Sequence, residues 1–148
     1  MNKRIKGRSL GREKDQKRAL LRTLLVSLIE NKKIITTLAK AKELKPFAER
    51  KLSLAKRGLK NEIEQNSKIR LLKKDLPIKS IKELFEIAKD SKREGGYTRI
   101  VQLMPRKSDV AKMAMIEWVD KGKVVLKKVE PKKEVQKKEV EKPTTKKN

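Results

Sequence analysis

The feature that most constrains the fold is a stripe of apolar side chains between residues 38 and 59. Its members recur every three or four residues: Leu38, Ala41, Leu44, Ala48, Leu52, Ala55 and Leu59. This spacing gives a helix one apolar face, and the phase is kept across Pro46, which indicates one kinked helix rather than two. Arg50 and Arg57 fall on the opposite face, free for solvent or for phosphate. Gly58 fits the end of the helix.

Apolar spacing and turn signals predict three further helices and three strands. The helices are expected at about residues 13–31, 63–74 and 80–90, and the strands at 33–36, 97–104 and 113–119. Ser80 followed by Glu83 is a capping-box pattern, so Ser80 is expected to cap the last helix. The two later strands can pair as an antiparallel hairpin with a long loop. Together these elements predict a two-layer α+β domain, with about four helices on a small mixed or antiparallel sheet.

Composition divides the chain into three parts. Residues 1–12 are rich in Lys and Arg, contain two glycines and no acidic residue, and are predicted to form a flexible basic arm. Residues 13–126 hold the predicted helices and strands and form the α+β domain. Residues 127–148 are mostly Lys, Glu, Val and Pro, with too little apolar surface to offset chain entropy, so this tail is expected to be disordered.

The aromatic and sulfur-containing side chains are interpreted mainly as core. Trp118 lies beside Ile116 on a predicted strand and is most simply a core residue, although partial exposure fits its position equally well. Met104, Met113 and Met115 are interpreted as core filler. With only four aromatic residues in the chain, base stacking cannot be the main mode of nucleic-acid binding.

Charge indicates the class of partner. The 148 residues include 43 Lys or Arg and 19 Asp or Glu, giving a net charge of +24. Such a body attracts polyanions, and nucleic acid is the abundant polyanion of a cell. Phosphate contact and shape recognition of a folded RNA or a duplex are therefore favoured. Alternatives are a nucleoid-type DNA-packaging protein and, more distantly, a protein bound to anionic lipid surfaces.

Enzymatic function is not supported by the residues present. The chain has no Cys and no His, which excludes disulfides, thiolate zinc sites, thiol nucleophiles and histidine bases. It has no Gly-rich phosphate loop and no convergent pair of carboxylates. We therefore expect no catalytic site, no cofactor, no metal and no small-molecule substrate. The longest apolar stretch is too short to span a membrane, and we expect a mature soluble protein of the cytoplasm.

Two segments are candidate binding sites. The basic arm can follow a phosphate backbone closely, because glycine lets the chain turn where a side chain would clash; the alternative is a solvated terminus. In the second segment, Gly95 and Gly96 precede Tyr97, Thr98 and Arg99. A Gly-Gly pair alone is usually a helix stop. Here Tyr97 and Arg99 are expected on one strand face, where the ring can stack on sugar or base and the guanidinium can bind phosphate.

Several sequence blocks, in order and spacing, resemble one family. KRIKGRSLGR at 3–12, ITTLAKAKEL at 35–44, GGYTRI at 95–100 and AMIEWVD at 114–120 are similar to the bacterial large-subunit ribosomal protein L-seventeen family. The resemblance implies a structural protein of the large subunit that binds 23S-type rRNA and lies beside neighbouring ribosomal proteins. By matching position it implies RNA contacts at Lys3, Arg4, Lys6, Gly7, Arg8, Arg12, Arg18, Arg22, Lys40, Lys42, Gly95, Gly96, Tyr97, Thr98 and Arg99.

Overall fold

The structure is a computed structural model that describes residues 7–120, apart from the side chains at positions 62 and 63. It contains four helices, α1 (Lys14–Asn31), α2 (Leu38–Gly58), α3 (Glu62–Lys73) and α4 (Ile78–Asp90). Its strands are β1 (Lys33–Thr37), β2 (Thr98–Gln102) and β3 (Met113–Trp118). The predicted tail and most of the basic part of the arm lie outside the described residues. Within residues 7–120 the order of elements expected from the sequence is confirmed.

The strands form an antiparallel sheet in the order β1-β3-β2. The predicted hairpin of β2 and β3 is confirmed, and β1 pairs with the other edge of β3. Ile116 lies at the centre of the sheet, opposite Ile34 on one side and Ile100 on the other. Because alternate residues of a strand face opposite sides, Ala114, Ile116 and Trp118 share one face, and all three are buried. This face is the sheet's contribution to the core.

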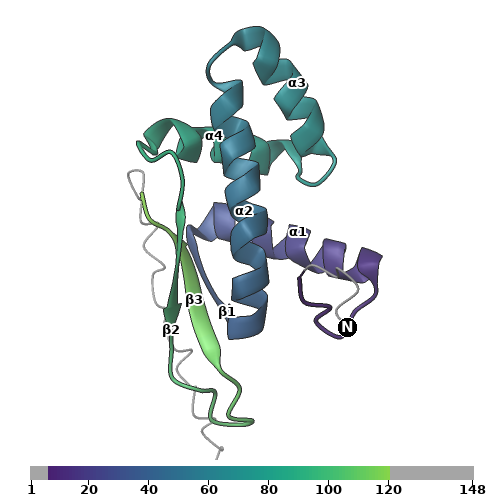
Figure 1. Cartoon of the computed structure of the whole chain (residues 1–148), viewed down its shortest axis with the longest axis vertical. Helices are drawn as coiled ribbons and strands as arrows, with labels where there is room; N and C mark the ends of the chain where they lie inside the picture. The colour runs from purple at the N-terminus through teal and green to yellow at the C-terminus, as the bar shows by residue number, and fades with distance from the viewer. Residues whose placement is uncertain (1–6, 121–148) are drawn as a thin grey trace, which may run out of the picture.

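Helix α2 occupies the centre of the molecule. It contacts all three strands and each of the other helices, and Figure 1 shows it running beside the sheet and passing in front of α1 and α4. Its predicted apolar stripe is the core face, since Ala41, Leu44, Ala48, Leu52 and Ala55 are all fully buried. Pro46 lies inside α2, so the prediction of one helix rather than two across this proline is confirmed. Helices packed on a small sheet confirm the two-layer α+β class.

The predicted start of α4 is wrong. The helix begins at Ile78, with Pro77 at the N-cap position, so Ser80 lies inside the first turn. Pro77 itself is extended, with φ −67° and ψ 156°, and its carbonyl accepts the first helical hydrogen bond from the Ile81 N–H at 3.1 Å. Ser80 is fully buried in the core, and among the described residues its hydroxyl oxygen has no hydrogen-bond partner. Ser80 and Glu83 therefore have the spacing of a capping box, but Ser80 occupies a buried position inside the helix and does not cap it.

The assignment of Met104 to the core is also wrong. Met104 is 88% exposed, because β2 ends at Gln102 and Met104 lies in the loop that connects it to β3. Met113 and Met115 are half-buried. For Trp118 the two alternatives are resolved in favour of the core, since its side chain is 1% exposed.

Candidate nucleic-acid interface

The described end of the arm is fixed to α2 by a carboxylate. The backbone N–H of Arg8 donates to Glu43 Oε2 at 3.2 Å, and Lys17 Nζ of α1 lies 2.8 Å from Glu43 Oε1. The Arg8 guanidinium is 4.0 Å from the same carboxylate and half exposed. Glu43 therefore joins the arm to α1 and α2 while the Arg8 side chain extends into solvent.

Gly7 leaves room for this contact. Its φ is +87°, and a Cβ added there would lie 2.5 Å from Glu43 Oε1. A residue with a side chain at position 7 would thus have a strained backbone, and either the Glu43 carboxylate or the arm would have to shift. The hydrogen bond from Lys17 lowers the pKa of Glu43, burial opposes it, and the Arg8 N–H adds to the lowering. The carboxylate is charged at neutral pH and anchors the basic arm.

The other assigned arm residues fall into two groups. Lys3, Arg4 and Lys6 lie outside the described residues. Arg12 is exposed and ends a turn, which is closed by the hydrogen bond from its backbone N–H to Ser9 O at 3.2 Å. Its side chain donates from Nη1 to Leu10 O at 3.0 Å. The turn holds the Arg12 guanidinium at the surface, and phosphate binding by the arm stays a prediction.

Arg18 and Arg22 of α1 converge on Asp75, in the turn between α3 and α4. Arg18 Nη2 lies 3.0 Å and Arg22 Nε 2.8 Å from Asp75 Oδ1, while Lys51 of α2 donates to Oδ2. Arg22 also donates from Nη2 to the carbonyl of Lys74 at 2.6 Å. These three cations tie α1, α2 and the α3–α4 turn together through one nearly buried carboxylate.

The Asp75 cluster consists of these four residues, Arg18, Arg22, Lys51 and Asp75, and the carboxylate reduces the charge that its cations can offer to an external ligand. Burial raises the pKa of Asp75, but the hydrogen bonds from Lys51, Arg22 and Arg18 outweigh it and hold the pKa well below its ordinary value. The charge of Arg18 and Arg22 is thus partly neutralised inside the protein. RNA contact by these two residues stays a prediction, in competition with a structural role that the sequence did not indicate. Lys51 and Asp75 were missed because no local pattern marks a contact between distant elements.

The Gly95–Arg99 segment is divided between core and surface. Tyr97 is 4% exposed, its hydroxyl donates to Glu94 O at 2.7 Å, and Lys56 Nζ lies 5.5 Å from the ring centroid. The expectation that this ring stacks on a sugar or base is therefore wrong, because α2 and the preceding loop cover it. Thr98 is buried too, and its hydroxyl donates to Glu49 Oε1 at 3.0 Å.

The remaining residues of the segment are accessible. Gly95 and Gly96 are exposed, and Gly96 has a φ of +63°, which places it in the left-handed turn that leads into β2. The Arg99 side chain is 60% exposed, with Nε and Nη2 donating to Glu117 Oε1 at 3.1 and 2.6 Å. The guanidinium edge that faces away from Glu117 can still donate to a phosphate.

Lys42 and Arg8 are brought together beside the start of α2. With Lys112, which precedes β3, they line a hollow of about 350 Å³. Lys40 is half-buried on a different side of the helix. Lys112 was missed by the sequence analysis, since its proximity to α2 arises only when β3 pairs with β1. Here the Leu38 N–H donates to Lys112 O at 2.9 Å.

Two classes of site are not found in the described part of the chain. Across residues 7–120 no group of acidic side chains is arranged to hold a metal ion. No helix among those residues is long and apolar enough to cross a bilayer. The chemistry that the surface offers is hydrogen bonding and charge pairing from Arg and Lys, which suits phosphate groups.

Similarity to known proteins indicates the family of this chain. The family model described as ribosomal protein L17 matches residues 20–119. A protein of Zymomonas mobilis is 41% identical over 124 residues, covering 82% of this chain and 84% of the relative. A protein of Erythrobacter litoralis is 43% identical over 121 residues, with 79% and 81% covered. A protein of Chloroflexus aurantiacus is 40% identical over 121 residues, with 80% and 100% covered.

All three relatives carry the name large ribosomal subunit protein bL17. The matched region runs from the first half of α1 to the end of β3, so it includes all three strands and the motif at Gly95–Arg99. The resemblance seen in the sequence is confirmed, and the chain belongs to the ribosomal protein L17 family.

Proposed function

We propose that the protein is a non-enzymatic structural constituent of the large ribosomal subunit, acting in translation in the cytoplasm as part of a ribonucleoprotein. In this role it binds large-subunit rRNA, through phosphate and shape contacts, and lies against neighbouring large-subunit proteins. The observation that carries the proposal is family membership, together with relatives named as large ribosomal subunit proteins. The net charge of +24 supports an RNA partner.

The structure suggests how the binding would work. Buried stripes fix the helices, and two internal carboxylates, Glu43 and Asp75, fix the cations around them. Arg8, Arg12, Lys42 and Arg99 are left with exposed side chains, at which rRNA phosphates can be neutralised. RNA segments that would repel one another can then approach the same protein surface.

A binding titration with the full-length chain tests this function. The protein is titrated with a large-subunit rRNA fragment and with duplex DNA of equal length, over a series of salt concentrations. If about 6 phosphates are contacted, the logarithm of the association constant should fall against the logarithm of salt with a slope of roughly −4 to −5. A slope near zero, or equal affinity for the DNA, would contradict the proposal; the latter would favour a DNA-packaging protein.

Sedimentation of a cell extract provides an independent test. The protein should co-migrate with large ribosomal subunits and stay with them in moderate salt. Recovery with chromatin or with vesicles of anionic lipid instead would overturn the assignment.

A further inference from the structure

A second basic surface lies on α2, on the side of the helix that faces away from the core. We call it the outer α2 face and define it by four residues: Arg50, Ser53, Arg57 and Lys60. At 100° per residue, Arg50 and Arg57 fall opposite the buried Ala48, Leu52 and Ala55, and Ser53 lies on the flank between them. Lys60 follows two residues after the end of the helix. Arg50, Arg57 and Lys60 are exposed, and Ser53 is half-buried.

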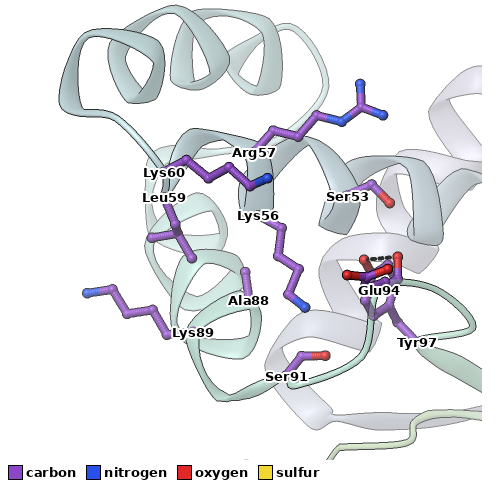
Figure 2. A pocket seen from close by; sticks show the side chains of 10 residues that line it. All are labelled: Ser53, Lys56, Arg57, Leu59, Lys60, Ala88, Lys89, Ser91, Glu94 and Tyr97. Carbon is purple, nitrogen blue, oxygen red and sulfur yellow. Dashed lines mark hydrogen bonds between the residues drawn. The ribbon is translucent and has the colours of Figure 1, made fainter.

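The outer α2 face is hollowed along its length. A hollow of about 440 Å³ is lined by Pro46, Glu49, Arg50, Ser53, Leu54 and Arg57. A second hollow of about 550 Å³ shares Ser53 and Arg57 and continues past Lys60 to Lys89 of α4. Because Ser53 and Arg57 line both, the two hollows are adjacent, and we refer to the pair as the groove. Figure 2 shows the Arg57 side chain extending outward above the Ser53 hydroxyl, with the Lys60 amino group beside its stem.

The cations of this groove have no internal partner of opposite charge. Among the described residues, no ion pair involves Arg50, Arg57 or Lys60. This differs from Arg18 and Arg22, which share Asp75. The charges of Arg50, Arg57 and Lys60 are therefore available to an external ligand.

Two contacts hold the groove in shape. Arg50 Nε donates to Pro46 O at 3.1 Å, which leaves both terminal nitrogens of its guanidinium for a ligand. Lys56 donates to the carbonyl of Arg93 and covers the Tyr97 ring, so it forms part of the groove wall. In Figure 2 the Lys56 chain runs inward, away from Arg57 and toward the loop that carries Tyr97. Tyr97 thus supports this surface from beneath.

We propose that the outer α2 face binds the sugar-phosphate backbone of an rRNA segment, at a site separate from the basic arm. Arg50 and Arg57 are seven residues apart, about 10 Å along the helix, and each guanidinium can donate to phosphate oxygens in a fork. The Ser53 hydroxyl between them supplies a further donor to phosphate or sugar. Charge complementarity favours RNA, and the inference rests on the rRNA-binding function proposed above.

The arm and the outer α2 face lie toward opposite ends of one helix. Glu43 fixes the arm near the start of α2, whereas Arg57 is in its last turn. The helix would therefore set the spacing between two segments of RNA backbone. A single rigid element between two binding surfaces restricts how those segments can be arranged.

The test uses the full-length double variant Arg50→Gln/Arg57→Gln. We expect affinity for the large-subunit rRNA fragment to fall about tenfold, and the salt slope to become shallower by about 2. Hydroxyl-radical footprinting should show one protected segment lost and the others kept. The matched control is Lys79→Gln/Lys82→Gln, which removes equal charge from exposed positions of α4 and should leave the footprint unchanged. Circular dichroism should show both variants folded.

The outcomes separate this inference from the proposed function. If the wild type binds the rRNA fragment and Arg50→Gln/Arg57→Gln binds it with the same slope and footprint, the outer α2 face does not bind RNA, while the function stands. Equal losses in both double variants would show that only total charge matters and would also overturn the inference. A wild type that fails to bind the fragment would contradict both proposals.

Discussion

The indole Nε1 of Trp118 donates a hydrogen bond to the main-chain carbonyl of Leu28 at 3.1 Å. Trp118 ends β3 and Leu28 lies in the last turn of α1, so the bond joins two elements that are far apart in the sequence. The Trp118 N–H also donates to Lys32 O at 3.2 Å. One core residue of the sheet thus fixes the end of the first helix.

We expect Trp118→Phe to lower the free energy of unfolding by about 1–3 kcal/mol. The smaller ring leaves part of the core unfilled, and the Leu28 carbonyl loses a buried partner. Denaturant unfolding followed by circular dichroism measures the change. A loss below about 0.5 kcal/mol would mean that the hydrogen bond and the packing contribute little.

Asp75→Asn should destabilise the protein by about 2–4 kcal/mol at pH 7. The substitution removes the charge that Arg18, Arg22 and Lys51 share, and leaves Lys51 with little solvent to compensate. Asp109→Asn is the control, because the Arg106–Asp109 pair lies at the surface, where solvent screens it, and its loss should change stability little. Equal effects of the two substitutions would contradict the structural role of Asp75.

The same carboxylate predicts a pH dependence. The pKa of Asp75 is lower in the folded protein than its ordinary value of about 4, so its stabilising effect is complete above that value. As the pH falls below about 4 toward the folded pKa, the effect is lost. Thermal unfolding at pH 7 and at pH 3 should therefore show the wild type approaching Asp75→Asn in stability. A difference that stays constant with pH would exclude the charge as its cause.

Gly7→Ala should weaken RNA binding more than Gly11→Ala does. Both glycines have a positive φ, but only at Gly7 would a Cβ meet the Glu43 carboxylate, since nothing lies within 4 Å of one at Gly11. Both substitutions strain the backbone, so the difference in affinity between the two variants measures the loss of the contact between the arm and Glu43. Affinity for the rRNA fragment is the measurement. Equal losses would show that the Glu43 contact does not position the arm.

Ser80→Ala should leave stability unchanged or raise it by up to about 1 kcal/mol. The hydroxyl of Ser80 is buried and, among the described residues, unpaired, so its removal takes away a desolvation cost and favours the helix. Denaturant unfolding measures the effect. A loss above about 1 kcal/mol would show that the hydroxyl has a partner in solution.

Local patterns were sufficient for the helices but not for the charged clusters. The stripe on α2 and the β-branched run of β1 reflect periodicity within a few turns of chain, which burial then preserves. The burial of Tyr97 depends on α2 and the 91–97 loop packing around it, and the Asp75 cluster depends on three elements meeting. Neither is visible in a local window. The sequence predicted a partner that is a polyanion, because net charge is a simple sum over residues. Which cations are paired inside the protein can be known only from the fold.

Sheet order also determines when the fold can be completed as the chain is synthesised. Of the three strands in residues 7–120, β3 is the middle one in the sheet yet the last in the sequence, and both β1 and β2 hydrogen-bond to it. Until β3 is synthesised, β1 has no partner strand and the last turn of α1 lacks its contact with Trp118. A growing chain therefore holds β1 and β2 without their native partner strand until β3 has been made.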